Sequence, residues 1–422
     1  MRYLKITGFV FLTCVIAQFV FVRRAASQSA TEAPTGFDNG TNGFVSQTDH
    51  DKNREEFERE ETIAEGLGPV YTAKSCAACH SHPSSGGGSQ VTHLTIGHRD
   101  LSGNYFGATA ELGNGSAFSL VPFSGFLWPR AICSDAQMRL PETGAAEPVR
   151  SARIALSGLG AGFVEAIPDT TILGIAAAQP GQSGGKIAGE PGIAPVFDNG
   201  LSFAVGRFGW KSGISSLLTF AAAAYVADLG ITNRIFQTEV VTLCDTVPDP
   251  EDAPNRPAGK QGIDAIATFL RATKGPPRDT LLAATADAQA GSQLFNQIGC
   301  GICHVGAIGT APAGTVINGG AFIVPAALGN KIIHPYSDFL LHDIGTGDGM
   351  VILGSPQSSA NKLRTLPLWG VRMRNRLMHD GESRTLTEAI QRHGGEASDV
   401  RNSFVSLTDA QKGQLMKFLK SL

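Results

Sequence analysis

The motif Cys-x-x-Cys-His occurs twice in this chain of 422 residues, at residues 76–80 and again at residues 300–304. A random chain with 7 cysteines and 10 histidines would contain it about 0.003 times, so two copies indicate a shared chemical purpose. The residues concerned are Cys76, Cys79, His80, Cys300, Cys303 and His304.

Three kinds of chemistry use paired cysteines, and only one of them requires the adjacent histidine. Two thiols spaced in this way can add to the vinyl groups of a porphyrin, while the histidine binds the iron. A zinc site would need four ligands converging from both motifs, and a redox dithiol would need neither His80 nor His304. The motifs therefore predict two covalently bound c-type haems, each with one of these histidines as an iron ligand.

The first 30 residues have the layout of a secretory signal peptide. Arg2 and Lys5 precede an apolar run over residues 8–22, and small residues follow it. The run is short for a membrane span, so we expect membrane attachment only if the segment stays uncleaved. We predict export to the periplasm, which agrees with haem attachment outside the bacterial cytoplasm. A net charge of −3 gives no reason to expect a nucleic-acid partner.

An exported chain can form disulfides, and two cysteines remain available for one. Cys14 lies in the signal segment and four cysteines belong to the motifs, which leaves Cys133 and Cys244. In an oxidising compartment, one disulfide between them is the economical expectation. The alternative is a pair of unpaired buried thiols.

The segments that must position the motifs carry helical patterns. Residues 31–60 are expected to form a flexible arm, and the charged stretch over residues 49–69 a solvated helix. Further helices are expected over residues 215–230, before the second motif with a stop at Gly299, and at the C-terminus. The C-terminal helix begins with a capping box of Thr408 and Gln411 and carries an apolar stripe.

An internal repeat indicates two related halves. The stretch WKSGISSL begins at Trp210 and HDGESRTL begins at His379, each downstream of one motif and upstream of a helix-forming run. We predict a mainly α fold with two cytochrome c-like haem domains and long irregular loops. The domains would span residues 61–284 and 285–422, with the first enlarged by an insertion.

Five stretches carry a resemblance to a known family: GLGPVYTAKSCAACHSHPSSGG, RIALSGLGAGFVEAIPDTTIL, GRFGWKSGISSLLTFAAAAYVADLGITN, HPYSDFLLHDIG and RTLPLWGVRMRNRLMHDGESRTLTEAIQRHGGEA. Together they resemble the di-haem oxidoreductase family, over residues 65–422. That family is similar to bacterial di-haem cytochrome c peroxidases and to the di-haem enzyme that matures tryptophan tryptophylquinone. The resemblance implies a periplasmic, mainly helical protein with two haem lobes. Relatives bind calcium between the lobes, but no compact acidic loop supports calcium here.

The resemblance also implies an iron ligand for the second haem. In the related peroxidases this ligand follows a helix that begins Thr-Leu-x-x-Ala, and TLTEAIQRH places His393 there. The alternatives are His379, Met373 and Met378. The repeat aligns His393 with Ala224 in the first half, and alanine cannot bind iron, so the first haem is expected to lack the equivalent ligand.

Other residues are candidates for iron binding, proton transfer or electron transfer at the first haem. His93 and His98, expected on a loop, could close its iron in a resting state or could be surface residues. Peroxide cleavage needs an acid or base, for which Glu165 and Asp228 are candidates; a salt bridge and a helix cap are their structural alternatives. The resemblance makes Trp210 a candidate electron bridge, with packing in a core as the alternative. Trp128 and Trp369 are expected to be packing residues.

Three functions remain open at this point. The leading one is a periplasmic oxidoreductase that reduces peroxide, or oxidises a substrate at a distance, through a reactive first haem and an electron-transfer second haem. Its partners would be a small electron-donor protein, a cytochrome or a cupredoxin, and peroxide or another small oxidant. The alternatives are a non-catalytic di-haem electron carrier and a subunit of a larger redox assembly.

Overall fold

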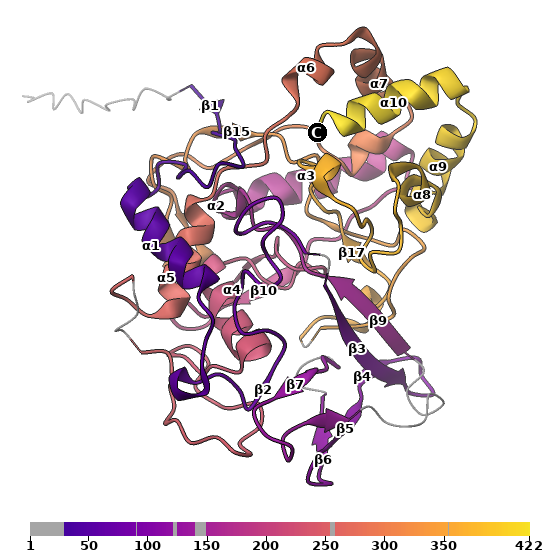
Figure 1. Ribbon diagram of the computed structural model, residues 1–422. Helices are drawn as coiled ribbons and strands as arrows, with labels where there is room; N and C mark the ends of the chain where they lie inside the picture. Colours follow the sequence, from indigo (N-terminus) through magenta and orange to yellow (C-terminus); the bar gives the residue numbers. More distant parts are fainter. Residues whose placement is uncertain (1–28, 90, 121–124, 140–148, 254–257, 353) are drawn as a thin grey trace, which may run out of the picture.

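A computed structural model describes residues 29–89, 91–120, 125–139, 149–253, 258–352 and 354–422 (Figure 1). Nearly all of the expected signal peptide, including Cys14, therefore lies outside the described residues. Among the residues that are described, no helix is both long enough and apolar enough to cross a membrane.

The expectation of a mainly α fold is wrong, because helices account for 31% of the chain and strands for 17%. The helices are α1 Gln47–Glu58, α2 Ala161–Glu165, α3 Asp169–Ser183, α4 Leu217–Ala224, α5 Gly262–Ala272, α6 Thr280–Ala283, α7 Ala286–Gln297, α8 Leu386–Gln391, α9 Ser398–Val405 and α10 Asp409–Lys420. The strands are β1 Thr31–Glu32, β2 Val70–Tyr71, β3 Thr92–Arg99, β4 Tyr105–Gly107, β5 Thr109–Leu112, β6 Ala117–Ser119, β7 Arg130–Ala131, β8 Met138–Arg139, β9 Val149–Ile154, β10 Ile193–Val196, β11 Ser202–Val205, β12 Ile308–Gly309, β13 Val316–Ile317, β14 Phe322–Ile323, β15 Lys331–Ile333, β16 Leu341–His342 and β17 Leu363–Arg364.

The strands that follow the first motif cause most of this departure. The sheets β4-β3-β9, β6-β5-β8 and β2-β7 all come from residues 70–154 and gather in one part of the molecule (Figure 1). They enclose an apolar cluster that includes Ile96, Leu120 and Trp128. Trp128 is only 1% exposed, as expected of a packing residue. Most of these strands are short, and β2 and β3 pair with the distant strands β7 and β9, so the sequence pattern did not predict them.

A disulfide joins this β-rich region to the segment that follows the helix α4. Cys133 and Cys244 are bonded, with their sulfur atoms 2.04 Å apart and their Cα atoms 6.6 Å apart. The predicted pairing is therefore confirmed. The other four cysteines of the described chain, those of the two motifs, are not in disulfides.

The helices of the second half match their predictions closely. The helix α7 ends just before Gly299, whose φ of 97° lies in the left-handed region that favours glycine. The helix α10 starts with the capping box of Thr408 and Gln411 and packs along α7. Their apolar faces meet at Phe295 and Phe418, whose ring centroids are 5.2 Å apart. These two helices fix the second motif against the C-terminal end of the chain (Figure 1).

The N-terminal segment differs from its prediction in two ways. The charged helix α1 stops at Glu58, since Arg59 is extended and its guanidinium bonds the carboxylates of Glu61 and Glu65, at 2.9 and 2.7 Å. The segment expected to be a flexible arm is held by hydrogen bonds: β1 pairs with β15, and Asn42 Nδ2 donates to Arg271 O at 2.8 Å. The helix α1 then packs on α5, beside α4.

Candidate functional site

One continuous cavity of ≈ 570 Å³ connects the two motifs. All six motif residues line it, from Cys76 and His80 in the first half to Cys300 and His304 in the second. The remaining wall is formed mainly by apolar side chains contributed by both halves. The fold therefore brings together two motifs that are more than 200 residues apart in the sequence.

The two motifs have the same local geometry. The amide of His80 donates to Cys76 O, and that of His304 donates to Cys300 O, both at 2.9 Å. His80 Nδ1 lies 3.1 Å from Gly87 O, and His304 Nδ1 lies 2.9 Å from Tyr336 O. A proton on Nδ1 leaves the lone pair on Nε2, which is the arrangement usual for a metal-bound histidine.

The protonation of these groups argues against a redox dithiol. Burial raises the pKa of the Cys76 thiol strongly and that of the Cys300 thiol to about 12, whereas reactive dithiols have lowered values. Burial also lowers the pKa of His304 to about 4, which keeps its imidazole neutral. A neutral imidazole is the form that binds iron.

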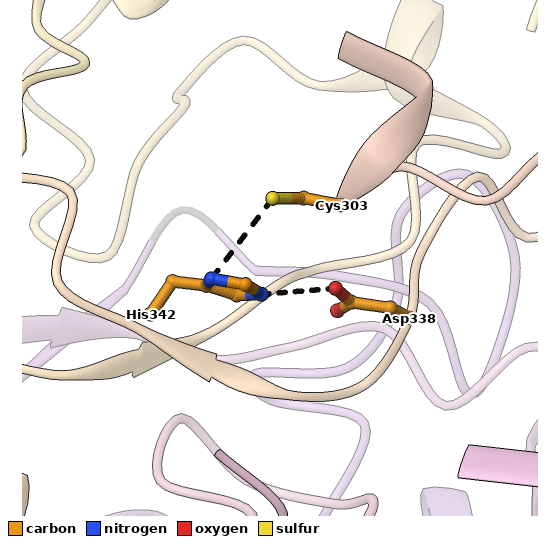
Figure 2. Close-up of side chains that lie close together, drawn as sticks. All are labelled: Cys303, Asp338 and His342. Carbon is orange, nitrogen blue, oxygen red and sulfur yellow. Dashed lines mark hydrogen bonds and ion pairs between the residues drawn. The ribbon is translucent and has the colours of Figure 1, made fainter. Parts of the chain in front are cut away.

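Figure 2 shows Cys303 of the second motif beside His342 and Asp338. These side chains are of types that bind metals, but their charges are those of an ion pair. Cys303 Sγ lies 3.9 Å from His342 Nδ1, and His342 Nε2 lies 2.9 Å from Asp338 Oδ2. His342 Nδ1 also lies 3.0 Å from Glu396 Oε2. Burial would lower the pKa of His342, but these carboxylates raise it to about 12. A doubly protonated imidazole cannot bind a metal, so His342 acts as a buried cation beside the second motif.

His393 lines the cavity beside the second motif. It follows α8, which begins with a capping box of Thr385 and Glu388. His393 Nδ1 lies 2.7 Å from Ala389 O, the same backbone anchoring that holds both motif histidines. Burial lowers its pKa, so this imidazole is also neutral. These features suit the predicted role of His393 as an iron ligand.

The three rival ligands for the second haem, His379, Met373 and Met378, also line the cavity. His379 is buried, and its ring meets the edge of Trp210 at 6.1 Å between centroids. Its Nδ1 has no hydrogen-bond partner in the described part of the chain. It therefore lacks the backbone anchor that His393 has.

The first half differs at the matching position. Ala224 lines the cavity at the end of α4, and a π-helix over residues 225–229 follows it. The π-helix presents Asp228 to the cavity, where its side chain is 43% accessible. Desolvation inside the cavity raises the pKa of Asp228 although its side chain faces open space there, while the neighbouring His93 and His80 oppose the shift. π-Helical turns often occur at functional sites because they reorient one side chain.

The two histidines expected on a loop lie instead on the strand β3. His93 lines the cavity, with Nδ1 3.9 Å from Asp228 Oδ1. His98 is not among the residues that line the cavity, and its ring stacks on Phe106 at 5.9 Å. The loop expectation is wrong because β3 pairs along its length with β9. Of the two, only His93 is placed near the first motif.

Glu165 lies outside the lining of the cavity and has a full set of partners. Its carboxylate is completely buried and receives two hydrogen bonds from Arg271, at 2.7 and 2.9 Å. Asn318 Nδ2 and the amide of Leu217 donate to it as well, at 3.0 and 2.8 Å. This geometry is that of the salt bridge considered above. Of the two candidate acids, Asp228 is the one that reaches the cavity.

Trp210 lines the cavity that both motifs share. Its Nε1 donates to Ile154 O at 2.8 Å, which fixes the indole. The next residue, Lys211, is buried and its Nζ lies 3.0 Å from Asp348 Oδ1. Arg153, another lining residue, donates to Asp348 from Nε at 2.7 Å. The hydrogen bond to Ile154 O therefore fixes the position of the Trp210 indole in the cavity wall. Trp369 was expected to be a packing residue, and it also lines the cavity.

Two arginines of the cavity wall, missed in the sequence, carry unpaired charge. Arg364 and Arg374 line the cavity, and neither forms an ion pair within the described residues. Their hydrogen bonds go to carbonyl oxygens, those of Gly209 and Pro367. Burial lowers the pKa of Arg364 to about 9 and that of Arg374 to about 10. Enclosed cations require an anionic partner, and the propionates of a haem would supply it.

The profile of the family described as "Di-haem oxidoreductase, putative peroxidase" matches residues 145–422. The chain belongs to this family. Membership requires two haems, and the cavity meets that requirement with two equivalent histidine motifs and two unpaired arginines. The RTLPLWGVRMRN stretch could have identified Arg364 and Arg374, because charged residues rarely interrupt an apolar run without a partner.

Two solved structures show distant likeness to this di-haem oxidoreductase. Hydrazine synthase from Kuenenia stuttgartiensis is 14% identical, with a TM-score of 0.38 and coverage of 98% of this chain and 100% of that one. A MauG-like protein associated with microbial copper homeostasis is 16% identical, with a TM-score of 0.40 and coverage of 94% and 93%. No match was found among curated proteins. These likenesses are too distant to bear on the chemistry.

Proposed function

We propose that the chain is a periplasmic c-type di-haem enzyme that reduces peroxide. The observation that carries the proposal is the asymmetry of the cavity wall. Beside the second motif the wall offers a second neutral, anchored histidine, His393. At the matching place in the first half it offers Ala224, followed by the acid Asp228. One site is thus suited to electron transfer and the other to a small substrate.

The residues that would hold the two haems follow from the motifs. Cys76 and Cys79 would attach the first through thioethers, with His80 as iron ligand. Cys300, Cys303 and His304 would hold the second in the same way, and His393 would be a further ligand to its iron. Arg364 and Arg374 would bind propionates, because they line the cavity without a carboxylate partner. Bound in this way, haem iron would relay the electrons that the reduction of peroxide requires.

The chain itself would manage the protons and the access of the substrate. Reduction of hydrogen peroxide to two water molecules takes two electrons and two protons. A carboxylate oxygen of Asp228 can accept a proton from one peroxide oxygen and return it to the other. Its pKa is raised above the ordinary value for aspartate, which favours the protonated form that can donate a proton. His93 Nδ1, 3.9 Å away, can stabilise the ionised form.

Electrons would come from a small donor protein, and Trp210 is suited to conduct them. Its indole lines the cavity shared by both motifs and is fixed by the bond to Ile154 O. If Trp210 conducts electrons, a Trp210→Phe variant should keep the iron coordination unchanged but exchange electrons between the haems more slowly.

Absorption and electron-spin-resonance spectra of the purified, haem-loaded protein test the proposal directly. We expect one high-spin and one low-spin ferric haem, cyanide binding at the high-spin haem, and turnover of peroxide with a reduced cytochrome or cupredoxin. Two low-spin haems without cyanide binding or peroxide turnover would instead identify an electron carrier.

Replacing His393 with alanine should convert the low-spin signal to high-spin while both haems stay covalently attached. The reason is that alanine removes a neutral imidazole that the cavity wall presents beside His304. His379→Ala is the matched control, because His379 lines the same cavity and is the rival ligand. If the control loses the low-spin signal and His393→Ala keeps it, the assignment passes to His379.

A further inference from the structure

A group of three carboxylates lies away from the haem cavity, on the segment that carries Cys244 of the disulfide. Glu239, Asp245 and Glu251 each place a carboxylate oxygen within 4.8 Å of the other two. The side chains of Glu239 and Glu251 are buried and Asp245 is half-buried. None of the three is among the residues that line the cavity. The group is therefore separate from the site proposed for peroxide.

The charge of this group is not balanced by the described part of the chain. Glu251 Oε2 accepts from the amide of Thr232 at 2.9 Å, and Asp245 Oδ1 accepts from the amide of Val247 at 2.9 Å. Glu239 receives no backbone hydrogen bond of this kind, because both of its carboxylate oxygens are buried without a hydrogen-bond partner. A buried carboxylate in this state is costly unless a cation or a proton joins it.

Lysine, arginine and histidine do not provide the missing charge, since no ion pair within the described residues includes any of the three acids. Burial and mutual repulsion raise the pKa of Glu239 to about 9 and that of Glu251 to about 7. The three acids therefore cannot all be ionised near neutral pH unless a cation takes the place of the protons they hold. A bound cation would offset both the repulsion among the three acids and the lack of a partner for Glu239.

We propose that Glu239, Asp245 and Glu251 form a binding site for a hard divalent cation, with calcium as the preferred ion. Carboxylate oxygens are the ligands that such ions take, and no free thiol or histidine takes part in the group. No two of these oxygens are more than 4.8 Å apart, which is about twice the Ca–O distance of about 2.4 Å, so one ion can reach all three. Magnesium suits the group less, because it demands a smaller and near-ideal octahedral shell.

The position of the group indicates what the cation would stabilise. Glu251 binds Thr232, which lies shortly after the π-helix that carries Asp228. Cys244, next to Asp245, is tied to Cys133 in the β-rich region. A cation at this point would connect the acid-bearing helix, the disulfide and the loop that includes residues 245–251. It would act as a brace for this segment without contacting the haems.

The test uses the full-length, haem-loaded protein treated with a chelator and then titrated with calcium chloride in a calorimeter. We expect Glu239→Gln and Asp245→Asn to bind one equivalent fewer than the wild-type protein. Calcium should raise the melting temperature of the wild-type protein by several degrees and that of the variants by much less. The matched control is Glu55→Gln, which neutralises an exposed acid on α1.

A second measurement separates the cation site from a merely structural role for Glu239. Without calcium, Glu239→Gln should be at least as stable as the wild-type protein, because the amide removes repulsion among the acids. A structural hydrogen bond would predict the opposite. Equal calcium stoichiometry in all four proteins, or no calcium binding by the wild-type protein, would overturn the proposal. Stronger stabilisation by magnesium than by calcium would overturn the choice of ion.

Discussion

Peroxide reduction by an Asp228→Asn variant is expected to be about 10² to 10⁴ times slower than in the wild-type protein, which is the usual contribution of a positioned acid or base. Asparagine keeps the size of the side chain but cannot exchange a proton. The haem spectra and the melting temperature should stay nearly unchanged, because Asp228 presents an accessible side chain to the cavity. Stopped-flow mixing with hydrogen peroxide measures the rate.

The pH dependence gives a second readout for the same residue. The raised pKa of Asp228 predicts an ionisation in the wild-type rate profile above the ordinary value of 3.8 for aspartate, and this ionisation should vanish in the Asn variant. A variant that reacts at the wild-type rate would show that the proton comes from elsewhere, with His93 as the next candidate on the cavity wall.

The Glu165→Gln variant is expected to lose about 3–5 kcal/mol in free energy of unfolding, the usual cost of breaking a buried ion pair from one side. The change leaves the Arg271 guanidinium enclosed without its carboxylate, while Asn318 and the amide of Leu217 lose a charged acceptor. Denaturant unfolding followed by circular dichroism measures the loss. At a temperature where the variant is folded, peroxide turnover should remain close to that of the wild-type protein.

The control for this prediction is the double variant Glu165→Gln with Arg271→Met, which removes both charges. Because the double variant leaves no buried charge without a partner, it should recover much of the lost stability. A Glu165→Gln variant with full stability and a hundredfold slower reaction would reverse the roles assigned to Glu165 and Asp228.

Local sequence predicted those parts of the structure whose determinants are local. Gly299 ends α7 and Thr408 begins α10, because a left-handed glycine and a side-chain cap act within a few residues of the chain. The bond between Cys133 and Cys244 could be predicted by elimination, since the motifs account for the other exported cysteines. The composition of both motifs likewise needs no knowledge of the fold.

The remaining errors concern contacts between distant residues. Glu165 looked like a candidate acid because its partner Arg271 is more than 100 residues away and cannot be paired with it by pattern. His93 was expected on a loop because β9, which pairs with its strand, starts only at Val149. Glu239, Asp245 and Glu251 lie in one short stretch, but no sequence pattern shows that their carboxylates converge.

The single cavity that connects both motifs has a consequence for how the protein is made. Its apolar wall is shared by the two halves, so the porphyrins of the two proposed haems would fill space that is hydrophobic core in another protein of this size. Cys76 and Cys300 line that wall and are only partly exposed. In the proposed c-type arrangement, attachment would therefore precede closure of the chain around the cavity. Under the proposed function, a chain that receives only one haem should remain incompletely folded in both halves, so haem supply would limit maturation after export.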